Sequence, residues 1–375
     1  MDKQPQKRKI PILFFYPLVA LAIAAAIAVF ALLYGAGGAN VLPAEAKGSS
    51  SIVEVENSAP TPAPPSRTGR FLPYRNAGLW GYKNSDGETV IEPKYTDAKE
   101  FEEDVAFAKD QQIGLYGLID RSGNWLVEPC WADVSAFCSG RAAVQKDGGS
   151  WGYIDAKGKL VVDYLYREAG GYSCGRAKVR TGDRWGYIDT QGDMAIDEEW
   201  LECNDFSEDL AFASLRKDGK TTWYIIDKAG MRVATLASNE RGTYYSEGFA
   251  VIERDGGENY INSKGRTAFS GLYEEAEAFS GGFAAVKMDG LWGYINTGGK
   301  FVIDAQYAGA RPFSGAMAAV QDQATGLWGY IDRYGVIKIP FRFESAGEFR
   351  QKSALVTEDG TVGLIDTNGK FVALY

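Results

Sequence analysis

The sequence predicts an all-β domain of nine tandem units, each an antiparallel sheet of three strands, preceded by one transmembrane helix. Three observations predict this fold class. A motif of the Trp-Gly-Tyr type recurs at intervals of 34 to 38 residues, 45 of the 375 residues are glycine, and 13% are aromatic. Frequent turns and aromatic side chains are typical of many short strands. After Gly35 no apolar stripe has the spacing of a helix.

The first predicted element is a membrane anchor. Residues 1–10 are a basic tail with four lysine or arginine residues, and residues 11–34 are 24 residues without a charge. As a helix this stretch is roughly 36 Å long, which exceeds the ~30 Å hydrocarbon core of a bilayer. The positive charge before it predicts a cytoplasmic tail and repeats outside the cytoplasm. A cleaved signal peptide is the alternative, although its apolar region is usually only about 7–15 residues long.

The second predicted element is a linker over residues 35–70. This segment is rich in proline, glycine, serine and alanine and includes the run from Ala59 to Pro65. Such a composition cannot bury a core, and the prolines extend the chain. We therefore expect the linker to hold the domain of residues 71–375 away from the bilayer.

The domain of residues 71–375 is built from one repeat. Each unit is expected to contain a strand such as Ala142–Val144, a tight turn that is often Asp-Gly, a second strand such as Trp151–Asp155, an Asp-x-x-Gly turn and a third strand. Asp-Gly favours a hairpin because both residues tolerate positive φ, and Asp-x-x-Gly suits a type I turn. The positions equivalent to the first motif residue are Trp80, Tyr116, Trp151, Trp185, Trp223, Glu258, Trp292, Trp328 and Val362.

The motif residues divide between two faces of the second strand. Side chains alternate across a strand, so Trp151 and Tyr153 share one face while Gly152 and Ile154 share the other. Aromatic residues at a fixed phase of a repeat usually pack neighbouring units, so we predict that they fill the interfaces between units. The alternative is that their rings form platforms for sugars. The glycine is expected to let another backbone approach closely.

The pattern Trp-Gly-Tyr-Ile-Asp-x-x-Gly, repeated over residues 71–375, resembles the WG-repeat (KWG-type) family of bacterial proteins. The resemblance is specific as a repeat and implies an all-β repeat domain. It implies little about activity, because the function of that family is largely uncharacterised.

Residues 222–262 depart from the repeat pattern. Tyr224 follows Trp223 where glycine is expected, and Glu258-Asn259 stands in place of Trp-Gly. The region is therefore either a degenerate pair of units or one specialised patch. If it is a patch, its candidate binding residues are Trp223, Tyr224, Glu258 and Asn259.

The nine units are predicted to form an open superhelical array. A closed β-propeller usually has four to eight blades of four strands, which nine three-stranded units fit poorly. The domain also starts in a first strand at Leu72–Arg75 and ends in a third strand at Phe371–Leu374. No unit therefore needs strands from both ends of the chain. A closed propeller-like ring is the alternative.

Charge and composition exclude several functions. The net charge is −9, and residues 71–375 alone carry −12 because residues 1–70 contribute +3. An acidic domain repels phosphate, so nucleic acid is not an expected partner. The chain contains no histidine, which removes histidine-assisted nucleophilic catalysis and every histidine metal site.

We therefore expect a protein-interaction platform in the cell envelope, single-pass in the cell membrane through residues 11–34. It is expected to be non-enzymatic, without catalytic residues, metal or cofactor. Its expected partner is an envelope or extracellular protein. A cell-wall or glycan-binding module is the alternative. A hydrolase that pairs carboxylates from residues 102–104, 197–199 or 274–275 is a third hypothesis, although solvated surface is the simpler explanation of such clusters.

The Asp-x-x-Gly aspartates and the cysteines have simple explanations. One aspartate per turn supplies too few ligands for calcium, so turn capping is expected. Cys130, Cys138, Cys174 and Cys203 are an even set outside the cytoplasm, which permits disulfides. Stacked units lie about 10 Å apart, however, beyond the ~7 Å limit between bridged Cα atoms. We expect buried free thiols.

Overall fold

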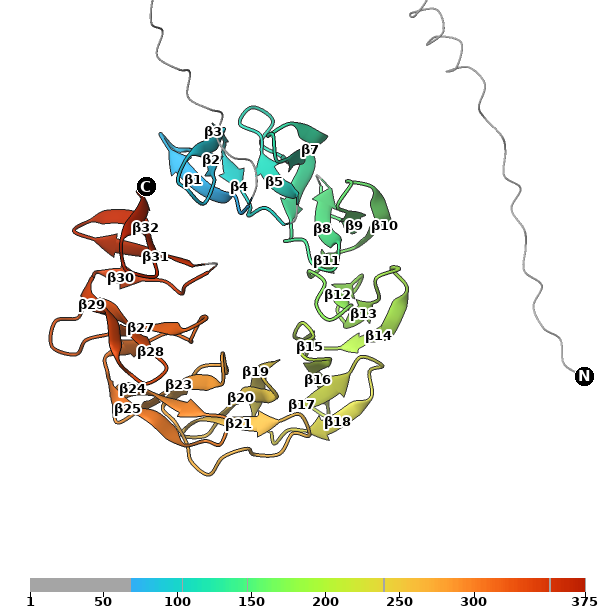
Figure 1. Cartoon of the computed structure of the whole chain (residues 1–375). Coiled ribbons are helices and arrows are strands. Elements are labelled where there is room, and N and C mark those ends of the chain that lie inside the picture. Colours follow the sequence, from blue (N-terminus) through green and yellow to red (C-terminus); the bar gives the residue numbers. More distant parts are fainter. Residues whose placement is uncertain (1–68, 103, 147, 239, 351, 375) are drawn as a thin grey trace, which may run out of the picture. The chain divides into compact units, whose positions relative to one another are not determined.

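The computed structural model describes residues 69–374, apart from residues 103, 147, 239 and 351 (Figure 1). All the described residues belong to one compact unit. The predicted basic tail, the predicted transmembrane segment and nearly all of the linker lie outside the described residues. Within the described part, no helix is long and apolar enough to cross a membrane.

Nine units of antiparallel strands follow one another in chain order, and each is built from hairpins. The first strands are β1 (Leu72–Asn76), β5 (Val105–Lys109), β8 (Arg141–Lys146), β12 (Ala177–Arg180), β16 (Leu210–Lys217), β20 (Phe249–Arg254), β23 (Phe283–Met288), β27 (Met317–Gln321) and β31 (Ser353–Glu358). The second strands, which carry the motif, are β2 (Leu79–Lys83), β6 (Tyr116–Asp120), β9 (Trp151–Asp155), β13 (Trp185–Ile188), β17 (Lys220–Asp227), β21 (Gly257–Asn262), β24 (Leu291–Asn296), β28 (Trp328–Asp332) and β32 (Thr361–Asp366). The third strands are β3 (Thr89–Tyr95), β7 (Trp125–Val134), β10 (Leu160–Tyr166), β14 (Met194–Trp200), β18 (Arg232–Thr235), β25 (Phe301–Tyr307), β29 (Ile337–Phe343) and β33 (Phe371–Leu374).

A short connector strand, which the repeat pattern does not predict, precedes most first strands and pairs with them. The connector strands are β4 (Asp97–Ala98), β11 (Glu168–Ala169), β15 (Glu202–Cys203), β19 (Arg241–Ser246), β22 (Glu275–Ala276), β26 (Gly309–Ala310) and β30 (Ser345–Ala346). In the third unit the end of β7 takes this place by pairing with β8, so two units merge into one seven-stranded sheet. Five of the eight sheets therefore have four strands rather than the three predicted. Six of the seven connector strands contain only two residues, and so short a strand shows no alternation of apolar residues in the sequence.

The sixth unit has no regular third strand among the described residues. Only two isolated bridges remain there, Ile261 to Thr267 and Glu258 to Tyr273. This is the unit in which Glu258 and Asn259 replace the usual Trp-Gly. The Asn259 side chain is 2% exposed and donates a hydrogen bond to the Phe269 carbonyl at 3.3 Å, so it takes part in holding this irregular segment.

Consecutive units share one hydrophobic cluster at each of the eight junctions. Each unit has a forward face, formed by the Trp and Tyr positions of its second strand and the first-strand residue opposite the tyrosine position. Each also has a backward face. It is formed by the two first-strand residues on either side of that residue and by the isoleucine position that follows the tyrosine position. Tyr294 on one forward face, for example, is fully buried in a cluster with Ala318, Val320 and Ile331 of the next backward face. The prediction that the repeated aromatic residues fill the interfaces between units is confirmed.

A hydrogen bond repeats at these junctions. Six motif tyrosines donate their hydroxyl to a backbone carbonyl 17 residues later, in the connector of the next unit, at 2.6 to 2.9 Å. The pairs are Tyr82–Lys99, Tyr153–Gly170, Tyr187–Asn204, Tyr260–Glu277, Tyr294–Arg311 and Tyr330–Gly347. The bond satisfies a buried donor. Burial also raises the pKa of these hydroxyls well above the usual value of 10.

The motif glycine permits a close crossing by the third strand, as predicted. A Cβ at Gly293 would lie 2.6 Å from the carbonyl oxygen of Ile303, and one at Gly152 would lie 2.6 Å from that of Val162. The register between the second and third strands shifts at this point, between Trp292 and Tyr294. Any side chain here must push the third strand away from the second.

We expect Gly293→Ala to lower the free energy of unfolding by about 1–3 kcal/mol, because the added methyl group meets rigid backbone. Denaturant unfolding of the full-length protein in detergent micelles measures the change. Gly182→Ala is the matched control, since a Cβ there meets nothing within 4 Å. Equal stability of the two variants would contradict this explanation of the glycine.

The Asp-x-x-Gly aspartates cap their turns. In each of six turns the carboxylate accepts hydrogen bonds from the backbone N–H groups two and four residues later, at 2.7 to 3.0 Å. These aspartates are Asp120, Asp155, Asp189, Asp227, Asp332 and Asp366. Across residues 69–374, outside the four gaps, no group of three Cys, Asp or Glu residues is placed to hold a metal ion.

The four cysteines are free thiols. The prediction that they are buried is wrong for Cys130 and Cys138, which are exposed, whereas Cys174 and Cys203 are partly buried. Cys130 occupies an exposed position in the alternation of β7, which the hydrophobic character of cysteine does not reveal. Burial raises the pKa of the Cys203 thiol to about 11, so this thiol is protonated at neutral pH.

Candidate functional site

The first and the ninth unit line one cleft of about 530 Å³, which we call the junction cleft. Its walls include Leu72 and Tyr74 of β1 on one side and Leu355, Val362 and Leu364 of β31 and β32 on the other. In Figure 1 the last strands lie beside the first, with an opening between them. The junction cleft therefore stands where a ninth junction would be.

The ninth unit replaces every residue of the repeated forward face. Val362 stands at the tryptophan position, Leu364 at the tyrosine position and Leu355 at the position opposite it. Leu355 is 50% exposed, whereas its equivalents Ala285 and Ala319 are fully buried. The ninth forward face is thus apolar, and none of the described units covers it.

The first unit alters the backward face in a complementary way. Leu72, Tyr74 and Lys83 occupy positions where the eighth unit, for example, has Ala318, Val320 and Ile331. The Lys83 ammonium lies 4.7 Å from the centre of the Tyr74 ring, and the Tyr74 hydroxyl shares a hydrogen bond of 3.1 Å with Thr89. This wall is apolar near Leu72 and covered by a positive charge near Tyr74.

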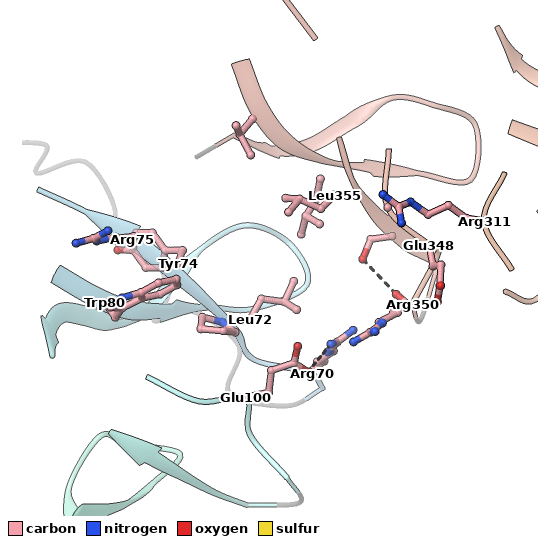
Figure 2. A pocket seen from close by; sticks show the side chains of 15 residues that line it. Arg70, Leu72, Tyr74, Arg75, Trp80, Glu100, Arg311, Glu348, Arg350 and Leu355 are labelled. Atoms are coloured by element: carbon pink, nitrogen blue, oxygen red, sulfur yellow. Dashed lines mark hydrogen bonds and ion pairs between the residues drawn. The ribbon is translucent and has the colours of Figure 1, made fainter. Parts of the chain in front are cut away.

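Charged side chains line the rim of the junction cleft. They are Arg70, Arg75, Arg311, Arg350, Glu100 and Glu348. In Figure 2 the side chains of Arg70 and Arg350 reach toward each other from opposite walls. Four arginines against two glutamates make the rim positive, although residues 71–375 as a whole are acidic.

Three of these arginines already have partners. Arg70 forms an ion pair with Glu100 at 2.7 Å, Arg75 donates to the Gly78 carbonyl at 3.2 Å, and Arg311 donates to the Ala346 carbonyl at 3.0 Å. The Arg350 guanidinium makes no hydrogen bond or ion pair with any residue that the structure describes. Arg350 is therefore the cation best placed to receive an anion.

Glu348 lies close enough to Glu277 for its charge to act on the Glu277 carboxyl group. Burial raises the pKa of the Glu277 carboxyl, the charge of Arg311 lowers it, and the charge of Glu348 raises it. Arg311 is thus engaged with the acidic groups on this side of the cleft. Since Arg70 is paired with Glu100, Arg350 and Arg75 are the arginines of the cleft that have no carboxylate partner among the described residues.

The residues of the predicted patch do not form one exposed surface. Trp223 is buried in the cluster shared by the fifth and sixth units. Asn259 is also buried, and its side-chain oxygen accepts a hydrogen bond from the Tyr260 amide. Tyr224 lies under the guanidinium of Arg232, 4.4 Å from its ring centre. Glu258 accepts a hydrogen bond from the Ala276 amide at 2.5 Å.

Glu258 does line a second hollow, of about 460 Å³, with Arg241, Tyr244 and Glu253 among its other residues. Burial raises the pKa of the Glu258 carboxyl, and the nearby Glu253 raises it further. One predicted residue thus reaches a surface depression, while its neighbour Asn259 supports the irregular sixth unit.

The acidic clusters lie in different units and hold local partners. Glu198 accepts hydrogen bonds from the amide and hydroxyl of Thr181, both at 2.8 Å. Glu275 forms an ion pair with Lys287 at 2.6 Å, and the side chain of Asp104 is 87% exposed. Glu103 lies outside the described residues. Among those described, the clusters do not converge on one groove.

The repeat pattern does not predict the junction cleft. Its signal was present in the sequence, because Val362 stands at a tryptophan position and Lys83 at an isoleucine position. Each substitution alone is an ordinary variation of a terminal repeat. Only the folded chain shows that the two altered faces line the same space.

The seven strongest copies of the repeat identify the family. The family model described as WG containing repeat matches residues 80–111, 116–149, 151–185, 185–220, 260–292, 292–323 and 328–361. These matches cover more than half of the chain, and the chain belongs to this family. The interval between the fourth and fifth matches falls on the irregular region of the fifth and sixth units.

Several solved structures resemble the chain at low identity. BamB from Moraxella catarrhalis is 14% identical, with a TM-score of 0.38 over 73% of this chain and 91% of that one. The C-terminal WD40 domain of Sif2 is 10% identical, with a TM-score of 0.38 over 76% and 90%. Hsv2 from Kluyveromyces lactis is 12% identical, with a TM-score of 0.37 over 52% and 70%. None of the curated proteins matches the chain.

Proposed function

We propose that this protein is a non-enzymatic interaction platform that holds a protein partner in the junction cleft. The observation that carries the proposal is the altered forward face of the ninth unit. Terminal repeats usually present a polar outer face, which keeps an array soluble. Here Leu355, Val362 and Leu364 keep the face apolar, and exposed apolar patches of this kind mark interaction sites.

We also infer that the array of nine units is not closed by pairing between its own first and last strands. β1 and β33 belong to separate sheets, and neither pairs with the other among the described residues. The first and ninth units instead leave a space between them, which a partner fills. This is a curved form of the open array that the sequence predicts, in which the two ends approach each other without packing.

Two further elements of the proposal come from the sequence. The basic tail and the uncharged residues 11–34 anchor the protein in the cell membrane, with the repeats outside the cytoplasm. The absence of histidine from the whole chain favours binding over catalysis. The glycan-binding alternative is less favoured, because the six repeated motif tyrosines are fully buried and present no face to a sugar.

Site-specific photo-crosslinking in membranes tests the proposal. The full-length protein, made in its host with a photoreactive phenylalanine analogue in place of Leu355, is expected to give a discrete adduct with another protein. The control places the analogue at Leu165, which is 62% exposed and lies on β10. An adduct at position 355 alone supports the proposal. The proposal fails if neither position or both positions give the adduct, or if the adduct at 355 is a polysaccharide.

A further inference from the structure

Within residues 69–374 the first unit has no connector segment paired with its first strand, whereas every later unit has one. In units two to nine a connector segment pairs with the first strand, whereas β1 pairs only with β2 among the described residues. Its other edge is therefore an open edge, which is able to accept another strand.

The later units show which backbone groups an added strand uses. The Lys99 amide donates to the Phe107 carbonyl at 2.9 Å, and the Thr96 amide donates to the Lys109 carbonyl at 3.0 Å. Phe107 and Lys109 face Leu118 and Tyr116 across the sheet.

The equivalents in the first unit follow from the same register. Pro73 faces Tyr82 and Arg75 faces Trp80, so the carbonyls of Pro73 and Arg75 occupy the two acceptor positions. Pro73 has no N–H group, but this register requires only its carbonyl. The first unit thus retains both acceptors without a connector strand to use them.

This open edge faces the junction cleft. Leu72, Pro73, Tyr74 and Arg75 all line it, although alternate side chains of a strand point to opposite faces of a sheet. Consecutive residues line the same space only if the space reaches the edge of the strand. An extended segment in the cleft can therefore contact the backbone of β1 and the apolar wall of the ninth unit together.

The charged residues that line the cleft favour a segment that carries a carboxylate. Arg350 has no side-chain partner among the described residues, and Arg70 reaches toward it from the other wall (Figure 2). Arginine binds a carboxylate with two parallel hydrogen bonds. Leu355, Val362 and Leu364 provide contacts for aliphatic side chains.

We infer that the partner contributes an extended acidic and aliphatic segment, which adds to β1 as its missing connector strand. One carboxylate of the segment lies between Arg70 and Arg350, and its aliphatic side chains cover the ninth forward face. This inference rests on the proposed function and specifies its ligand. Main-chain hydrogen bonds give such strand addition its affinity, and side-chain pockets give it specificity.

A peptide selection tests the inference on the full-length protein in detergent micelles. Random decapeptides displayed on phage are selected on this protein, and the enriched peptides are then synthesised. We expect them to share a carboxylate beside aliphatic residues and to bind Arg350→Glu at least about tenfold more weakly, since a charge-assisted pair becomes a repulsion. Arg333→Glu, at an arginine outside the cleft, is the matched control and should bind normally.

Methylation of the peptide backbone distinguishes strand addition from side-chain docking. Every second amide of an added strand points toward β1, and the amides between them point away from it. N-methyl groups on the first set should therefore weaken binding by about tenfold or more, whereas N-methyl groups on the second set should not. The Arg75 amide, which lies on the same edge of β1 as the Arg75 carbonyl, should also gain protection from hydrogen exchange.

Each contrary outcome has a separate meaning. Binding that depends on Arg350 but tolerates methylation on both sets would overturn strand addition and leave the proposed function intact. If no enriched peptide depends on Arg350, the acidic segment is ruled out. Binding that appears only after residues 36–68 are deleted would assign the cleft to the preceding part of this chain. A dimer that Arg350→Glu dissociates would assign it to a second copy.

Discussion

Replacing Tyr294 by alanine is expected to lower the free energy of unfolding by about 3–5 kcal/mol. This side chain is fully buried at the junction of the seventh and eighth units, where its ring packs edge-on against Phe313 at 4.8 Å between ring centres. The substitution leaves a cavity between two units and removes the hydrogen bond to the Arg311 carbonyl at 2.8 Å. Stability in a repeat array depends on contacts between neighbours, so one lost junction weakens the whole domain.

Denaturant unfolding of the full-length protein in detergent micelles measures this effect. Tyr334→Ala is the matched control, because Tyr334 is 87% exposed on the turn that follows β28, and its loss should change stability by less than about 0.5 kcal/mol. Tyr294→Phe keeps the ring and removes only the hydroxyl, so it should cost about 1 kcal/mol. If Tyr294→Ala behaves like Tyr334→Ala, the junction clusters do not hold the array together.

Alkaline solution is expected to unfold the domain between about pH 10 and pH 12. Burial raises the pKa of six motif tyrosines well above 10 in the folded protein, while the unfolded chain titrates near 10. The folded state therefore retains protons that the unfolded state releases. The resulting stability is fully present below pH 10 and is lost as the pH rises above it. Each tyrosine removes about 1.4 kcal/mol per pH unit in this range.

Circular dichroism and tyrosinate absorption, followed together through an alkaline titration, check this prediction. Backbone signal and ionisation should change in one cooperative step. Tyr187→Phe is the informative variant, because it removes one group whose pKa burial raises. It should be less stable than the natural protein at neutral pH but lose stability less steeply above pH 10. Gradual ionisation of all the tyrosines with the backbone signal intact would contradict the prediction.

The repeat and its strands were largely predictable because each unit carries its own local signals. The predicted second strand Trp151–Asp155 has the same bounds as β9, and the predicted Asp155–Gly158 turn is capped as expected. The burial of the aromatic residues followed from their fixed phase. The connector strands were not predictable, since six of the seven contain only two residues and β19 lies in the irregular fifth and sixth units. Their pairing depends on the course of the chain between units.

The junction cleft was beyond sequence analysis for a different reason. Its two walls, at Leu72 and Leu364, are separated by nearly the whole domain, and no local pattern relates them. The sequence predicts Trp223 and Asn259 as binding residues instead, because the motif itself is broken there. Both side chains are buried, so this break changes the packing of two units. At these two positions the departure from the repeat is absorbed in packing, whereas at Leu355, Val362 and Leu364 it forms a wall of the junction cleft.

The two faces of each unit are chemically different, which gives the array a direction. At six of the eight junctions the tyrosine hydroxyl of one unit donates forward to the connector of the next. Neighbouring units are therefore related by a step along the chain and not by a twofold axis. Two ninth forward faces in separate molecules therefore cannot complete each other as two consecutive units do. Association through the terminal faces has to be head to tail, and such contacts produce closed rings or filaments instead of symmetric pairs.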